Sequence, residues 1–218
     1  MIIEDTQIYP YVKDYLDKIT VIAVKKGTCF SKPDNKDDQI YYILEGIVKV
    51  ESVSAEGKKT IIDVISENEF AGQISYFRKS NFYGNSLAFT DIKLLCLKLG
   101  VINTLMNYPE FSSFFYFKTS ARLYQMYKKM LMGYLFSQSE LVSYYIIANS
   151  INGKFIFKSI DQICENVNIS RRNLYNILNK YENEGVILKA DNGKYNINKE
   201  KMLIENSDKV KKFMENSY

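Results

Sequence analysis

The chain has 218 residues, no histidine, and only four arginines beside 25 lysines, and its formal net charge of +4 is only weak support for nucleic-acid binding. The missing histidine excludes Ser-His-Asp and Cys-His nucleophiles and histidine-ligated zinc or haem, and the three isolated cysteines form no CxxC pair typical of a disulfide framework or iron–sulfur site. We therefore expect no enzyme, metal or cofactor, and a cytoplasmic chain without a membrane partner, since no apolar run approaches the ~20 residues that span a bilayer.

The first half of the chain is rich in β-formers. Short runs of Ile, Val, Tyr and Phe alternate with turns that contain Gly, Asn and Asp, a pattern typical of an antiparallel barrel or roll. A short helix or turn is expected near residues 10–18. The predicted strands are residues 19–24, 40–44, 47–53, 60–65 and 87–99.

A long helix is predicted from Pro109 to about Phe136. Proline in the first turn and Glu110 at the positive end of the helix dipole both favour this start. A long helix with two apolar stripes needs two partners, so we expect one face on the β-domain and the other in a two-stranded coiled coil with a second copy of the chain. A core helix inside a monomer is the alternative. The stripe assigned to the dimer is Phe117, Ala121, Tyr124, Leu131 and Leu135, and beside it lie Leu123, Tyr127, Met130 and Tyr134.

The C-terminal third predicts two short helices joined by a tight turn. After a helix at residues 139–149 and a loop through Gly153, Ser159 and Gln162 fit a capping box that opens a helix ending near residue 167. Asn168 tolerates the left-handed conformation of a tight turn. Ser170 is then the expected N-cap of a second helix over residues 171–183.

A β wing is predicted after this second helix. Gly185 ends the helix, a strand at residues 186–188 follows, and the turn Asp191-Asn192-Gly193 leads into a returning strand at residues 195–197. The pattern is that of a winged helix-turn-helix, and the last twenty residues predict one more amphipathic helix.

The N-terminal face of the second helix carries residues suited to reading DNA. In a helix-turn-helix this face meets base edges in the major groove, where arginine matches guanine and asparagine matches adenine. Two of the four arginines stand together here, and Ser170, Tyr175 and Lys194 are candidates for phosphate contacts. A solvated helix face in an interaction module is the alternative. The predicted DNA-contacting residues are Ser170, Arg171, Arg172, Asn173, Tyr175, Asn176 and Lys194.

The order of β-roll, long helix and winged helix-turn-helix resembles the Crp/Fnr family of bacterial transcription regulators. Three segments carry the resemblance: YYILEGIVKV at 41–50, NEFAGQ at 68–73 and ICENVNISRRNL at 163–174. Residues 170–198 are most similar to the YeiL-type subgroup. The resemblance implies an α+β fold with a cyclic-nucleotide-binding-type β-roll at 1–107, a dimerisation helix and hinge at 108–137, and a winged helix-turn-helix DNA-binding domain with a C-terminal helix at 138–218.

The resemblance also implies partners. They are a second copy of the chain and a pseudo-palindromic site in double-stranded DNA, with recognition helices about 34–36 Å apart. RNA polymerase and a small-molecule effector are further candidates, the effector lying between the β-roll and the long helix. The implied effector-pocket residues are Gly72, Gln73, Tyr76, Asn85, Ser86, Met126 and Tyr127.

The candidate pocket departs from the family's cyclic-nucleotide binders, which hold the ribose and phosphate with Gly-Glu followed by Arg-Ser or Arg-Thr. Gln73 stands in the glutamate position, and residues 82–86 contain no arginine. A buried phosphate without that cation would be poorly paired. We therefore predict a regulator that cAMP does not control. The alternative is a ligand-binding β-roll protein whose winged helix contacts a protein instead of DNA.

Overall fold

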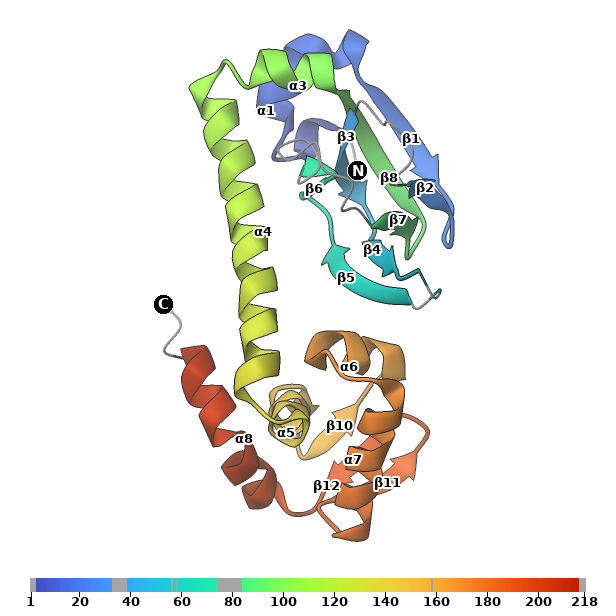
Figure 1. Cartoon of the computed structure of the whole chain (residues 1–218), viewed down its shortest axis with the longest axis vertical. Helices are drawn as coiled ribbons and strands as arrows, with labels where there is room; N and C mark the ends of the chain where they lie inside the picture. The colour runs from blue at the N-terminus through green and yellow to red at the C-terminus, as the bar shows by residue number, and fades with distance from the viewer. Residues whose placement is uncertain are drawn as a thin grey trace. The chain divides into compact units, whose positions relative to one another are not determined.

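The computed structural model describes residues 3–32, 39–55, 57, 59–73, 84–157 and 159–215 (Figure 1). It divides into two units, Met1–Tyr124 and Gln125–Tyr218. The division falls inside the long helix α4 (Pro109–Leu135), whose bounds match the sequence prediction closely.

The first unit is an antiparallel β-roll of two four-stranded sheets, ordered β1-β8-β3-β6 and β2-β7-β4-β5. The first sheet contains β1 (Thr20–Val24), β3 (Gln39–Glu45), β6 (Phe70–Ala71) and β8 (Ile92–Lys98). The second contains β2 (Cys29–Ser31), β4 (Val48–Val53), β5 (Lys59–Ile65) and β7 (Asn85–Ala88). Short helices flank them: α1 (Tyr9–Val12), a 3-10 helix (Lys13–Lys18) and α3 (Leu99–Leu105).

Strand β3 is buried on both faces, which explains its unbroken apolar sequence. Its residues Ile40 to Leu44 are each at most 4% exposed. Tyr42 packs in a cluster with α1, α3 and the start of α4, whereas Ile43 packs in a second cluster between the two sheets. The strand therefore joins the two cores of the β-roll.

The predicted turn at Gly46 is required by its backbone and its surroundings. Gly46 has φ +90°, and a Cβ there would lie 2.5 Å from the Asp91 carbonyl oxygen. Asp91 belongs to a turn that divides the predicted strand 87–99: β7 ends at Ala88, and β8 begins at Ile92. The prediction of one strand was wrong because Phe89 and Thr90, both of types common in strands, continue the strand pattern into the turn.

In the described residues of the second unit, four helices follow α4 and pack with a small antiparallel sheet ordered β11-β12-β10-β9 (Figure 1). The helices are α5 (Gln138–Ala148), α6 (Ile160–Val167), α7 (Arg171–Asn183) and α8 (Glu200–Glu215). The strands are β9 (Ser150–Ile151), β10 (Lys154–Ile156), β11 (Ile187–Asp191) and β12 (Lys194–Ile197). The hairpin β9–β10 occupies the region predicted as a loop through Gly153.

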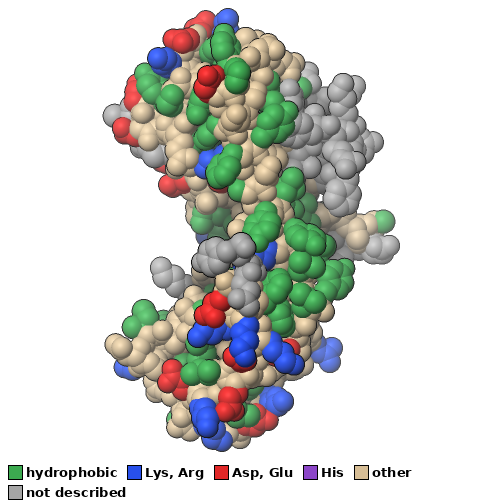
Figure 2. Space-filling model, turned by 90° about the vertical axis from the view of Figure 1, so that its left-hand side faces the viewer, with side chains coloured by type: hydrophobic (Ala, Val, Ile, Leu, Met, Phe, Trp, Pro, Cys, Tyr) green, Lys and Arg blue, Asp and Glu red, His purple; other side chains and the backbone are tan. Residues whose placement is uncertain are grey.

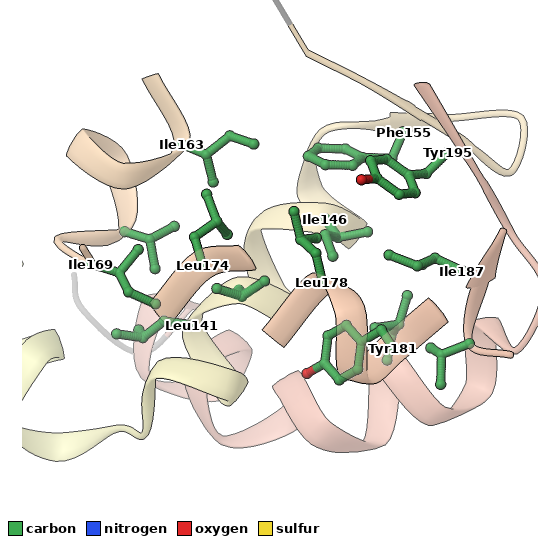
Figure 3. Close-up of a cluster of buried hydrophobic side chains, with 14 of the residues drawn as sticks. Leu141, Ile146, Phe155, Ile163, Ile169, Leu174, Leu178, Tyr181, Ile187 and Tyr195 are labelled. Atoms are coloured by element: carbon green, nitrogen blue, oxygen red, sulfur yellow. The ribbon is translucent and has the colours of Figure 1, made fainter. Parts of the chain in front are cut away.

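One hydrophobic core holds these elements together (Figure 3). Leu174 and Leu178 on α7 point into it, and they meet Ile163 of α6, Ile146 of α5 and Phe155 of β10. Burying a leucine of this size stabilises the fold by about 1.5–3 kcal/mol. The buried side of α7 is thus fixed by packing, as its periodicity predicted.

The caps of α6 and α7 follow the predicted pattern with one difference. Asn168 is left-handed, with φ 56° and ψ 50°, and the Ser170 hydroxyl accepts from the Asn173 N–H at 3.2 Å. Ser159 instead caps α6 through the Asp161 N–H at 3.1 Å, not through Gln162. The complete capping box lies at the start of α5, between Ser137 and Glu140.

Candidate functional site

The exposed face of α7 is set by the residues that it buries. Because Leu174 and Leu178 point into the core, the opposite side of α7 faces outward. Arg172, Tyr175 and Asn176 are all exposed, and Tyr175 is 48% exposed. The structure therefore places these three predicted DNA-contacting residues together on one accessible surface.

Arg171, the first residue of α7, pairs with an aspartate of the preceding helix. Its Nε donates to Asp161 Oδ1 and its Nη2 to Asp161 Oδ2, both at 2.5 Å. The pair is exposed, since the side chains retain 68% and 46% of their surface. Sequence reasoning did not assign a role to Asp161, because ten residues and a turn separate it from Arg171.

Two more of the predicted residues are held by neighbours. Asn173 donates through Nδ2 to Gln138 Oε1 of α5 at 3.0 Å. The hydroxyl of Ser170 caps α7, since its oxygen accepts a hydrogen bond from a backbone N–H of the helix. Both residues are thereby fixed in position at the start of α7.

The hairpin β11–β12 lies where the wing was predicted. Lys194, at the start of β12, lies 3.3 Å from Asp191 across the turn. Gly193 has φ +72°, and a Cβ there would lie 2.7 Å from the Phe157 carbonyl oxygen. This distance is too short for any side chain, so the position requires glycine. The turn is therefore closely packed on residue 157, and it presents Lys194 at an exposed position.

A polar network fastens the C-terminal half of α7. The Tyr181 hydroxyl lies 2.6 Å from Ser143 Oγ and 2.8 Å from Ser139 Oγ, both on α5. Asn206 Nδ2 of α8 donates to the same Tyr181 oxygen at 3.0 Å. Three helices thus meet at one buried tyrosine hydroxyl.

Helix α4 exposes a long apolar surface. Figure 2 shows hydrophobic side chains gathered along its outward side. Phe117 is 71% exposed and Tyr134 is 81% exposed, so both predicted stripes are accessible in a single chain. The face of α4 that packs on the β-roll carries Phe111, Phe115 and Thr119 instead. The expectation that one of the two stripes would cover the β-domain was therefore wrong, because the buried face lies on another side of the helix and ends at Thr119.

The rest of the predicted dimer stripe is only partly covered. Ala121, Tyr124 and Leu135 are exposed, and Leu131 is half-buried. Large exposed apolar surfaces of this kind mark interaction sites in soluble proteins.

Two ion pairs connect α4 with the interior of the β-roll. Arg122 donates through Nε to Asp63 Oδ2 at 2.6 Å and through Nη1 to the Phe70 carbonyl. The side chains of Arg122 and Asp63 are only 12% and 11% exposed. One turn earlier on α4, Lys118 lies 3.3 Å from Glu69. Sequence reasoning missed this cluster, although an arginine four residues after Lys118, in a chain with four arginines, was an available signal.

Gln73 is the predicted pocket residue with the clearest environment. It is 2% exposed, and its Oε1 has no hydrogen-bond partner among the described residues. Gly72 beside it has φ +91°. Asn85 and Ser86 lie on β7, where Ser86 faces Val50 of β4.

The other predicted pocket residues are not joined to these. Tyr76 lies outside the described residues. Met126 and Tyr127 belong to the second unit, where Tyr127 is 54% exposed. The predicted effector pocket as a whole therefore remains a prediction.

Neither a metal site nor a membrane span is present in the part of the chain that the structure describes. No group of three or more Cys, Asp or Glu side chains there could hold a metal ion. No helix in those ranges is long and apolar enough to cross a bilayer.

Known proteins share this architecture. Residues 21–108 match the cyclic nucleotide-binding domain family, whereas no curated protein matches the sequence. A CRP/FNR-family transcriptional regulator of Thermus thermophilus is similar with a TM-score of 0.61 and 19% identity, over 87% of this chain and 98% of that one. The c-di-GMP-responsive global regulator CLP of Xanthomonas campestris gives a TM-score of 0.68 and 15% identity, over 86% and 98%. At these identities the likeness establishes the fold, an α+β arrangement of β-roll and long helix, as the sequence predicted.

Proposed function

We propose that this chain is a sequence-specific DNA-binding transcription regulator. In this proposal α6 and α7 form a helix-turn-helix, α7 is the recognition helix, and β11–β12 is the wing. The observation that carries it is the exposed N-terminal face of α7, where Arg172, Tyr175 and Asn176 lie together while Leu174 anchors the helix. Arginine and asparagine are the side chains that read guanine and adenine edges, and no acidic residue precedes Glu182 on this helix.

The proposed assembly is a homodimer joined along α4. Its support is the set of exposed apolar side chains on α4, which includes Phe117, Tyr124 and Leu135. Single exposed hydrophobic residues are common on protein surfaces, whereas many along one helix mark an interaction site. Two-fold symmetry would present two copies of α7 to the two halves of a pseudo-palindromic DNA site. The fold shared with CRP/FNR regulators is consistent with this arrangement.

The proposed regulator is not controlled by cAMP. Gln73 is neutral where a glutamate would accept from a ribose hydroxyl, and Arg122, an arginine within the described part of the β-roll, is already paired with Asp63. A cyclic phosphate entering this interior would compete with that carboxylate for the cation. Calorimetry with cAMP and with cGMP tests this, and micromolar binding of either would contradict it.

DNA binding is tested by selecting bound fragments from genomic or randomised DNA and measuring the affinity for the recovered site at several salt concentrations. We expect affinity to fall steeply with salt, and Arg171→Ala with Arg172→Ala to relax the base preference. The control is Lys201→Ala with Lys211→Ala, which removes two exposed positive charges from α8. Equal binding of the arginine double variant and the wild type to cognate and scrambled DNA would refute the proposal.

The dimer is tested by sedimentation equilibrium, in which the wild type should have twice the chain mass of 25.4 kDa. Phe117→Glu with Tyr124→Glu should give a monomer with unchanged circular dichroism, since both side chains are exposed in the single chain. A stable wild-type monomer at micromolar concentration would contradict this part of the proposal.

A further inference from the structure

We infer that Asp161 is a positioning residue for DNA recognition: it holds the Arg171 guanidinium so that its free edge can read one guanine. The inference rests on the proposed function and adds a specificity-determining residue outside α7. It begins from the two hydrogen bonds between Arg171 and Asp161, each 2.5 Å long.

Asp161 binds one edge of the Arg171 guanidinium and leaves the other N–H groups available for DNA. A guanidinium has five N–H donors, one on Nε and two on each terminal nitrogen. Asp161 takes the side edge, made of Nε and one N–H of Nη2. One N–H on Nη2 and two on Nη1 remain, and the end edge, with one N–H from each of these nitrogens, offers two parallel donors that match the O6 and N7 acceptors of guanine.

Both partners of the pair stand on fixed backbone. Asp161 is the second residue of α6, and its N–H is bonded by the cap Ser159 at 3.1 Å. Arg171 is the first residue of α7, immediately after its cap Ser170. The backbone that carries Asp161 and the backbone that carries Arg171 are therefore both held in place at a capped helix start.

Fixing the arginine has two consequences for DNA binding. An unpaired arginine loses rotamer entropy when it contacts a base, whereas one already held by Asp161 loses less, so more of the hydrogen-bond energy appears as discrimination between bases. The Asp161 carboxylate also offsets the arginine charge and repels phosphates, which weakens sequence-independent binding. Asp161 therefore lowers non-specific affinity and raises base specificity.

The test compares base profiles of wild type, Asp161→Asn and Arg171→Ala on every single-base variant of the site recovered from a randomised double-stranded DNA library. Arg171→Ala should lose preference at one guanine, by about 5- to 150-fold for a full bidentate contact. Asp161→Asn should lose part of the preference at that same base pair and bind scrambled DNA more tightly than the wild type.

The matched control is Asp191→Asn, which removes the same charge from another exposed ion pair of this unit, Asp191 with Lys194 of the proposed wing. It should raise affinity for all sequences alike and leave the base profile unchanged. Thermal melting of each variant verifies that it is folded, which we expect because the Asp161–Arg171 pair is exposed.

Three results would overturn the inference. An Asp161→Asn profile equal to the wild type at the guanine that Arg171→Ala loses would show that the contact does not position the arginine. Tighter cognate binding of Asp161→Asn with equal or sharper preference would show that Asp161 competes with DNA instead. A wild type without any base preference would refute the proposed function and this inference together, which distinguishes it from the first two results.

Discussion

Replacing Tyr181 with phenylalanine should destabilise the second unit by removing one oxygen atom. The hydroxyl has one donor and two acceptor lone pairs, so it can satisfy at most three of its four surrounding contacts at once. Those contacts are Ser139 Oγ at 2.8 Å, Ser139 O at 3.1 Å, Ser143 Oγ at 2.6 Å and Asn206 Nδ2 at 3.0 Å. The substitution keeps the ring and therefore isolates the polar network.

The size of the effect follows from what the partners can still do. Asn206 continues to donate to Ser143 Oγ at 2.7 Å, so the acceptor side of that serine stays satisfied. Because Tyr181 donates its single O–H to Ser139 O, the buried Ser143 O–H donates to Tyr181 and loses this acceptor in the variant, and leaving such a group unpaired costs about 1–3 kcal/mol. We expect a loss of about 2 kcal/mol in the free energy of unfolding.

The measurement is urea unfolding of the full chain followed by circular dichroism, where this loss corresponds to a midpoint lower by about 1 M for a small unit. Tyr175→Phe is the matched control, because the same chemical change is made on the same helix at a side chain that is 48% exposed. A loss below about 0.5 kcal/mol, or an equal loss in both variants, would refute the reasoning that the network stabilises α7.

Three further substitutions test other features of the two units. Asp63→Asn should destabilise the β-roll by about 3–5 kcal/mol in urea unfolding, because it leaves the buried Arg122 without its carboxylate, whereas Asp91→Asn in the exposed pair with Lys25 should change little. Gly46→Ala should lower the free energy of unfolding by at least about 2 kcal/mol, since the new side chain combines a positive φ with a clash. Gly57→Ala should lower it less, because Gly57 also has a positive φ but open space around it. The Ser137 hydroxyl and N–H hold the pKa of Glu140 below its usual value, so the carboxylate stabilises α5 above the ordinary glutamate pKa and this stabilisation is lost as pH falls through the lowered pKa. Acid titration of Glu140→Gln should lack this loss, and an unchanged acid profile would contradict the assignment.

Local signals in the sequence predicted local structure well. Asn168, Ser170 and Gly185 define a turn, a cap and a helix end by their own backbone preferences, and each has the predicted role or a positive φ in the structure. The extent of α4 was predictable for the same reason, since it depends on periodicity and on Pro109.

Pairings between distant residues could not be predicted in this way. Arg122 and Asp63 are 59 positions apart, and only the closed β-roll brings them together. The sequence of α4 is apolar on several sides, so periodicity alone could not identify the Phe111 and Phe115 side as the one that packs on the β-roll. The exposed side of α7 was predictable from its periodicity, but the partner of Arg171 was not.

The position of β3 between two cores bears on how the first unit exchanges its amide protons. The strand pairs with β8, more than 50 residues later in the chain, with Tyr42 opposite Leu95. Its amides can reach solvent only when the sheet separates and both hydrophobic clusters open at once. Deuterium uptake at Tyr42 and Ile43 should therefore report global opening of the β-roll, and contacts this distant in sequence should make the unit slow to close again.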